Sequence, residues 1–337
     1  MGGRGRFDFR RRQSSDCAAC VVKLMSRPTR PCRAMLEAYL SSTIAMATPI
    51  LLAALGELIV EQSGVLNVGI EGSMLAGAFF GLTTAYFSGS IAFGLIAAIA
   101  AAIAMNALLA ALVVNLAINQ VVAGTALDIL ALGLTGVFYR RLFGITGKAF
   151  TIRPIGPLAL GPLAKLPIVG RALFTQNALV YAAFGLVPIV GFVMTRTYYG
   201  LRLRASGERP EAADALGLGV FWLRWQALVI AGALTGLAGA YLTLAYADTF
   251  VEGISAGRGF VALAVVIVGR WNAYGIAAAS VLFGAAMGLQ FELQASGGVL
   301  PYQIFLALPY ALTLVVLALV GGQAHAPSAL GERYVRP

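Results

Sequence analysis

The chain is poor in charge, and this shortage excludes most soluble folds. Only 11% of its 337 residues are charged, less than half of the roughly 25% that a soluble domain carries. A chain with so few charges cannot cover a water-facing surface, and 59% of its residues are hydrophobic. Its apolar segments reach about 20 residues, the length of a membrane-spanning helix rather than of an alternating barrel strand. The composition therefore predicts an all-α polytopic protein embedded in a lipid bilayer.

Cysteine and histidine are also scarce, which argues against a metal centre. The three cysteines, Cys17, Cys20 and Cys32, all lie near the N-terminus, and the only histidine is His325. Cys17 and Cys20 have the spacing of half a zinc site, but no second pair or nearby histidine completes it. The apolar segments contain no HExxH motif and no paired aspartates. We therefore predict no metal site, no catalytic residue and no enzyme.

The basic residues are grouped, although the net charge is +10. Nine of the 24 basic residues lie between Arg4 and Arg33, and five lie between Arg196 and Arg224. Charge beside membrane spans usually sets topology, so we predict no nucleic-acid binding. The second group places the 196–224 loop on the cytoplasmic side. Counting spans outward from that loop leaves the Arg-rich N-terminus outside, against the usual bias.

The apolar pattern predicts about nine transmembrane helices between residues 35 and 322. The segments are roughly 36–60, 66–87, 91–115, 118–140, 178–196, 225–247, 258–272, 273–292 and 300–321. Residues 1–34 are interpreted as a disordered extension or as an over-extended start, since Met35 is a plausible true start. Residues 323–337 form a C-terminal tail, and the Pro/Gly-rich residues 141–177 an extramembrane loop.

Two polar, glycine-rich stretches interrupt the apolar pattern. The first, Gly56–Gly72, carries the carboxylates Glu57, Glu61 and Glu71 together with Asn67. The second, Asp248–Phe260, carries Arg258. In each half of the chain a span precedes the break and two follow it, a pattern typical of transporters with inverted repeats. We therefore predict an inverted internal repeat, with the first break inside and the second outside.

Several segments resemble one family. They are Leu51–Leu58, Ser63–Gly72, Ala256–Ala264 and Val268–Asn272. All are similar to the permease subunits of bacterial ABC importers of the ribose/branched-chain amino acid class, in the nucleoside (simple-sugar) branch, over about residues 35–322. The resemblance implies a plasma (inner) membrane protein that works with a separate ATP-binding subunit, a second, different permease and an extracytoplasmic substrate-binding lipoprotein. It implies that this chain binds no cofactor and that the partner uses the ATP.

The cytoplasmic loop contains a candidate coupling helix. Pro210 suits a first helical position, Glu211 the positive first turn and Gly217 a stop. The family pattern is Gly-x-Asn-Pro-x-Ala-Ala-x-x-x-Gly, and here Arg209 replaces its asparagine. The resemblance implies that this helix docks on the ATPase; an ordinary capped loop helix is the alternative. The implied coupling residues are Gly207, Glu208, Pro210, Ala212, Ala213, Asp214 and Gly217.

Polar residues near the breaks are candidates for lining the translocation path. Glu57, Glu71 and Arg258 are weighed against a structural role as helix caps or ion-pair partners, with Glu252 a candidate partner of Arg258. Asn67 is the better candidate, because a neutral amide suits an uncharged, hydroxyl-rich solute. The rival function is an ion-driven secondary carrier or facilitator, in which Asp128 binds a proton or sodium ion.

Overall fold

The computed structural model describes residues 30–144, 152–158, 173–295, 307, 309, 311–316, 318 and 326–334. Within these residues the regular elements are all helices, and one isolated antiparallel bridge pairs Pro157 with Asn177. The all-α prediction is therefore confirmed for the part of the chain that the structure describes. Most of the predicted 300–321 span lies outside it, although residues 311–316 are helical.

The described helices include long ones of spanning length and a few short ones. They are α2 (Arg30–Gln62), α3 (Ile70–Ser88), α4 (Ile91–Ala110), the π-helical turn η1 (Ala111–Asn115), α5 (Gln120–Phe143), α7 (Ala178–Arg196), α8 (Tyr198–Glu208), α9 (Pro210–Ala215), α10 (Val220–Tyr241), the π-helical turn η3 (Leu242–Tyr246), α11 (Arg258–Val268) and α12 (Ala273–Ala295).

Among the described residues, six helices are long and apolar enough to cross a membrane. They are Leu36–Gln62, Ile91–Asn115, Gln120–Phe143, Ala178–Arg196, Val220–Tyr246 and Ala273–Glu292. Two further predicted segments are helices but fall outside that set: α3, which begins with polar residues, and the 11-residue α11. The count of about nine therefore stays a prediction.

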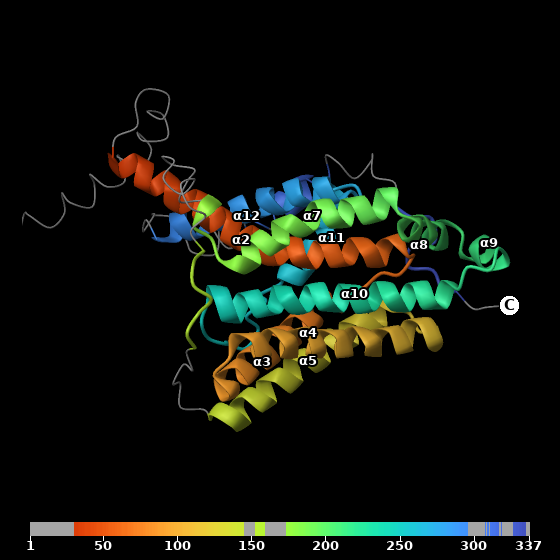
Figure 1. Cartoon of the computed structure of the whole chain (residues 1–337), viewed down its shortest axis with the longest axis horizontal. Coiled ribbons are helices and arrows are strands. Elements are labelled where there is room, and N and C mark those ends of the chain that lie inside the picture. The colour runs from red at the N-terminus through yellow and green to blue at the C-terminus, as the bar shows by residue number, and fades with distance from the viewer. Residues whose placement is uncertain are drawn as a thin grey trace, which may run out of the picture.

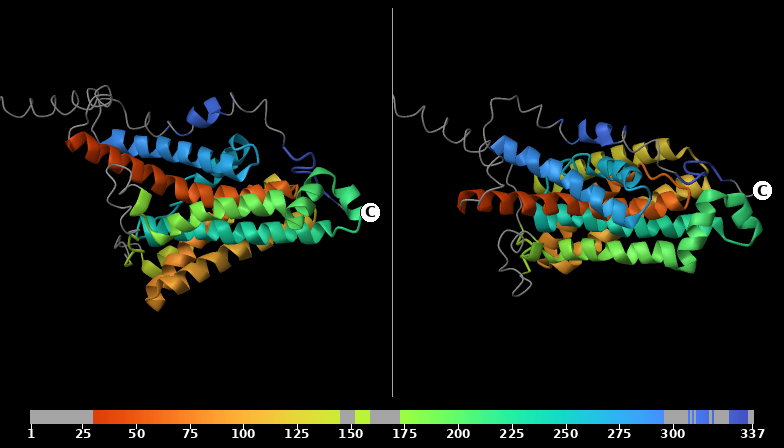
Figure 2. Two further views of the ribbon diagram at one scale, coloured as in Figure 1. Left: turned by 45° about the horizontal axis from the view of Figure 1, so that its top comes forward. Right: turned by 90° about the horizontal axis from the view of Figure 1, so that it is seen from above.

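Two helices, α2 and α10, form the centre of the bundle and pack against each other. On one side, α10 packs against α3 and α4, and α5 lies outside them against α3. On the other side, α2 packs against α7, α11 and α12. Figure 1 shows this layering, with α12 and α11 beyond α2 and the orange and yellow helices α3 to α5 beyond α10, and Figure 2 shows it from two further directions.

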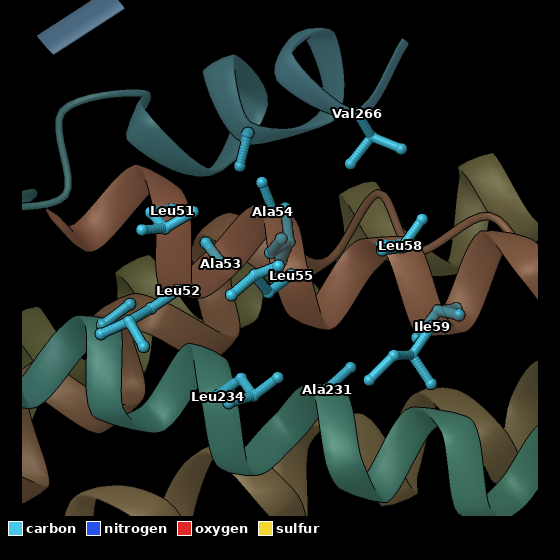
Figure 3. Close-up of a cluster of buried hydrophobic side chains, with 14 of the residues drawn as sticks. Leu51, Leu52, Ala53, Ala54, Leu55, Leu58, Ile59, Ala231, Leu234 and Val266 are labelled. Carbon is cyan, nitrogen blue, oxygen red and sulfur yellow. The ribbon is translucent and has the colours of Figure 1, made fainter. Parts of the chain in front are cut away.

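Close packing in the centre relies on small residues. A Cβ on Gly236 would lie 2.7 Å from the Ala98 carbonyl oxygen, and one on Gly232 would lie 2.8 Å from the Ile103 Cα. Figure 3 shows how the leucines of α2 fill the space between Leu234 of α10 and Val266 of α11. The glycine-rich face of α10 is therefore a packing surface against α4.

The first break is shorter than predicted. Helix α2 continues through Gly56, Glu57 and Glu61 to Gln62, so only residues 63–69 interrupt the helices. Gly56 remains helical because it is a packing position: a Cβ there would lie 3.2 Å from the Ala231 Cα. Helix α2 also begins earlier than predicted, at Arg30.

The cytoplasmic loop predicted over 196–224 holds two helices where one was predicted. The additional helix, α8, begins after Thr197, whose hydroxyl accepts a hydrogen bond from the Gly200 N–H at 3.2 Å. An N-cap of this kind is a sequence signal for a helix start. The helix was not predicted because the arginines of this segment alternate with Leu201 and Leu203, so no apolar run is visible. The following span also starts earlier than predicted, at Val220.

Candidate functional site

The predicted coupling segment forms a compact helical unit at one end of the bundle, where Figure 1 shows α8 and α9 together. Helix α9 begins with Pro210 at its first position and follows the extended residue Arg209. Gly217 ends the turn with φ +80, and its N–H donates to the Asp214 carbonyl at 2.8 Å. Only glycine adopts this conformation without strain. The predicted start and stop of this short helix therefore match the structure.

The faces of α9 differ in exposure. Glu211 and Ala212 are exposed and Leu216 is 82% exposed. Ala213 is buried in a cluster with Val220 and Tyr334. Of these apolar residues, Ala213 is therefore turned into this chain, whereas Ala212 and Leu216 are accessible to a partner.

Helix α8 ends directly against the first break. Gly207 is buried, and a Cβ on it would collide with the Gln62 carbonyl oxygen and lie 3.0 Å from the Gly64 nitrogen. Any side chain at this position would therefore separate the coupling helices from the end of α2. The coupling motif has a glycine at position 207 because the backbone of α8 contacts the backbone of the break there.

Local turns satisfy the first N–H groups of the first break, and side chains of α2 and α5 satisfy later ones. The Leu66 N–H donates to Gln120 Oε1 at 2.6 Å, and the Asn67 N–H donates to Glu57 Oε1 at 3.0 Å. Where the chain resumes as α3, the Gly72 N–H donates to Asp128 Oδ1 at 2.6 Å. Without water, a segment in hydrocarbon needs such internal partners. Glu57 and Asp128 are therefore accounted for as backbone acceptors.

Asn67 belongs to a buried amide chain. Its Nδ2 donates to Asn106 Oδ1 at 2.9 Å, and Asn106 Nδ2 donates to Ser73 Oγ at 2.9 Å. All three side chains are buried. Asn67 Oδ1 is buried and accepts no hydrogen bond among the described residues. This oxygen gives Asn67 one acceptor that the fold itself does not use.

Glu71 joins the two breaks. Its Oε1 accepts a hydrogen bond from the Gly257 N–H at 2.7 Å, and its Oε2 accepts one from the Gly259 N–H at 2.6 Å. The carboxylate of α3 thus caps the start of α11, where the positive end of the helix dipole favours an anion. Gly259 leaves room for this contact, because a Cβ there would lie 2.7 Å from Glu71 Oε2. In the structure, Glu71 therefore acts as a helix cap, one of the two roles considered for it.

The second break contains its own polar contacts. Arg258 Nη1 donates to the carbonyls of Ile254 and Ser255 at 2.9 and 3.2 Å, consistent with anchoring of this loop. Glu252 forms a bidentate ion pair with Arg140, with two contacts of 2.8 Å. The hydrogen bond from Arg140 lowers the pKa of the Glu252 carboxyl, whereas desolvation raises the pKa of Asp248.

Three contributors to these contacts were missed from the sequence. Gln120 and Asn106 are polar residues within or at the start of apolar spans, which is the signal that could have found them. Trp271 is the third: its Nε1 donates a hydrogen bond to Glu61 Oε2, which links the turn between α11 and α12 to α2. In the described residues, no group of three or more His, Cys, Asp or Glu side chains is placed to hold a metal ion.

Comparisons with known proteins agree with this arrangement. Residues 39–317 match the model of the family described as the permease component of the branched-chain amino acid transport system. A nucleoside ABC transporter permease of Lactococcus lactis is 35% identical, covering 89% of this chain and 98% of its own length. A putative glucose ABC transporter permease of Haloferax volcanii is 35% identical (88% and 97%). A guanosine ABC transporter permease of Bacillus subtilis is 32% identical (90% and 98%).

No solved structure matches this chain. The family match spans most of the sequence, and the three relatives align over nearly their whole length. Apolar helices of spanning length run through the same region. The chain therefore belongs to the permease family of ABC transporters that the branched-chain amino acid model describes, and it is a multi-pass protein of the plasma membrane.

Proposed function

We propose that this chain is the membrane-spanning permease subunit of an ATP-driven importer for nucleosides or simple sugars. The substrate class rests on the relatives, which are named for nucleosides, guanosine and glucose. The coupling role rests on the position of α8 and α9 at the end of the bundle. A short helix with an exposed apolar face projects from the bundle, and its base contacts the first break through Gly207.

In this proposal, the coupling residues have two tasks. Ala212 and Leu216, flanked by Glu211 and Asp214, present the face that seats in a groove of the ATPase. Gly207 and Glu208 connect that face to the bundle, while Pro210 and Gly217 define the helix between them. Closure of the ATPase pair displaces α9, and the displacement reaches residues 63–69 because Gly207 lies on their backbone.

The proposal assigns ATP to a partner. The importer contains a separate ATP-binding subunit, a second and different permease and an extracytoplasmic substrate-binding lipoprotein, and this chain binds no cofactor and hydrolyses no ATP itself. The family match supports this division of work, because it identifies the chain with the permease component alone.

The proposal also includes about nine spans and an inverted repeat, with the ninth span at 300–321. The packing pattern supports the repeat. Helix α2 packs against α11 and α12 of the second half, whereas α10 packs against α3 and α4 of the first half. The two breaks also contact different segments of the chain. The first contacts α8, and the second receives the Ile152 N–H on its Asp248 carbonyl at 3.1 Å.

For the translocation path we propose Asn67 as the main polar contact. Its unused buried acceptor suits a sugar hydroxyl once the break shifts. Glu57, Glu71 and Arg258 border the same path, and each of them forms a hydrogen bond with the backbone of a break. Their contribution is to hold the breaks in shape.

The test introduces charge on the exposed face of α9. Leu216→Glu should abolish ATP-dependent uptake of labelled guanosine or glucose into vesicles that contain the whole importer, while the chain still inserts and purifies normally. The matched control is Leu158→Glu, an equally apolar position that is 50% exposed and bonded to Gln176 at the other end of the bundle. Normal uptake by the Leu216→Glu variant would contradict the proposal.

The rival ion-driven carrier is tested in the same vesicles. Collapsing the proton and sodium gradients while ATP is maintained should leave uptake unchanged. Loss of uptake under those conditions would favour the carrier, with Asp128 as its ion site.

A further inference from the structure

The C-terminal segment 326–334 lies along the coupling helices, at the end of the bundle where Figure 1 marks the C-terminus. The Ala329 N–H donates to the Gly207 carbonyl at 2.9 Å. Ser328 Oγ donates to the carboxylate of Glu208 at 2.9 Å and also to its carbonyl. Both residues of the coupling motif at the end of α8 are therefore bonded to a segment more than 100 positions away in the sequence.

The same segment contacts the first break. The Gly331 N–H donates to the Gly64 carbonyl at 3.2 Å. Gln120 bridges the two, because its Oε1 accepts the Leu66 N–H at 2.6 Å while its Nε2 donates to the Glu332 carbonyl at 3.2 Å. The Gln120 side chain that forms this bridge is 3% exposed. The segment thus closes a triangle between the coupling helices, the break and the start of α5.

Tyr334 packs against the buried face of α9. Its ring is 7% exposed and packs in a cluster with Ala213 and Val220. The Phe221 ring centroid lies 5.8 Å away, and the Arg224 guanidinium carbon lies 5.7 Å from the Tyr334 centroid, a cation–π distance. The buried face of α9 therefore packs on the C-terminal segment as well as on the bundle.

Between α9 and the segment runs a groove of about 350 Å³. Glu211 and Ala212 line it on one side, and Ser328, Ala329, Glu332 and Arg333 line it on the other. Glu332 and Arg333 are exposed, and neither side chain takes part in the backbone contacts described above. One wall of the groove is thus the coupling motif, and the other is the C-terminal segment.

We propose that residues 326–334 form the second wall of the docking site for the importer's ATP-binding subunit. This inference rests on the proposed function, since it takes α9 as the first wall. A protein surface that seats Ala212 and Glu211 also meets Glu332 and Arg333, because all four line one groove. The segment is hydrogen-bonded to Gly64 through Gly331. Docking of the ATP-binding subunit therefore displaces the first break by two routes, one through Gly207 and one through Gly331.

The test measures affinity of the importer's ATP-binding subunit for the purified permease assembly in lipid nanodiscs. The double variant Glu332→Lys with Arg333→Glu reverses two exposed charges and should weaken binding about tenfold, because like charges at an interface are strongly unfavourable. The matched control is Arg153→Glu, an exposed charge at the opposite end. It should bind normally.

Two further outcomes separate this inference from the function on which it rests. If Leu216→Glu weakens binding and the charge-reversed segment does not, the C-terminal segment is no part of the docking site, and the coupling role of α9 stands. If neither variant changes affinity or uptake, the proposed function itself fails. Because charge reversal could also displace the segment, hydrogen exchange of the Ala329 and Gly331 amides, which donate to Gly207 and Gly64, is measured in the double variant and should match the wild type.

Discussion

The two helix breaks are held in different ways. The first, residues 63–69, begins with local turn bonds from the Ser63 and Gly64 N–H groups, and its later N–H groups, those of Leu66 and Asn67, donate to the side chains of Gln120 and Glu57. The second, residues 247–257, is built from local turns: the Ile254 N–H donates to the Val251 carbonyl and the Ala256 N–H to the Gly253 carbonyl, at 3.0 and 2.9 Å. Asn67 is fully buried, whereas Val251 is 60% exposed.

This difference indicates which break follows the coupling helices. The end of the first break is bonded to side chains of α5 and α2, and its Gly64 backbone packs on Gly207 of α8, so it moves when those helices move. A segment closed by its own turns keeps its shape when they shift. The first break is therefore suited to receive motion from α9, and the second to act as a preformed counterpart. Glu71, bonded to Gly257 and Gly259, is the link between them.

The largest expected effect comes from separating the first break from the coupling helices. Gly207→Ala places a Cβ against the Gln62 carbonyl oxygen. Overpacking of this kind costs about 1–3 kcal/mol, and we expect most ATP-dependent uptake to be lost. Gly219→Ala is the control, because a Cβ there would lie 3.8 Å from its nearest neighbour, Trp222. Equal uptake by the two variants would show that the contact at Gly207 transmits nothing.

The next effect comes from cutting the link between the breaks. Glu71→Ala leaves the Gly257 and Gly259 N–H groups without their acceptor, at about 1–3 kcal/mol for each buried donor. Glu71→Gln keeps one oxygen and should fall between wild type and alanine. Thermal unfolding in detergent measures the order. A glutamine variant less stable than the alanine variant would contradict the capping role.

A smaller effect is expected at the start of α3. Asp128→Ala removes the acceptor of the Gly72 N–H, and loss of a cap costs about 1 kcal/mol. The expected result is a modest fall in the unfolding temperature with substantial uptake retained. Asp128→Asn, which keeps an acceptor oxygen, should be nearer to wild type. Abolished uptake in both variants with unchanged stability would instead indicate an ion site.

The smallest effect is expected from the ion pair of the second break. Arg140 and Glu252 are 65% and 39% exposed, and solvent screens such pairs. Arg140→Ala should leave unfolding temperature and uptake unchanged at neutral pH. Because Arg140 lowers the pKa of Glu252 below its ordinary 4.5, any contribution is present above pH 4.5 and is lost as pH falls through the lowered value. A large loss of stability at pH 7 would overturn the contrast between the breaks.

The spans and short coupling helix were predictable because apolar length, Pro210 and Gly217 are local signals. The first break was predicted to be longer than it is, because glycine density alone does not distinguish a turn from a packing position such as Gly56. The roles of Glu71 and Asp128 depend on contacts between residues far apart in sequence, which no local pattern contains. The ordered C-terminal segment was likewise beyond prediction, since its partners Gly207 and Gly64 are remote.

The most direct measurement is amide hydrogen exchange on the assembled importer, with and without ATP and vanadate. Exchange reports opening of specific backbone segments. The account predicts that trapping changes exchange in peptides covering 63–69 in the wild type and changes it much less in Gly207→Ala, where only the route through Gly331 remains, while the Ile254 and Ala256 amides respond weakly in both. A strong response at 250–257 with none at 63–69, in an importer that transports normally, would contradict it.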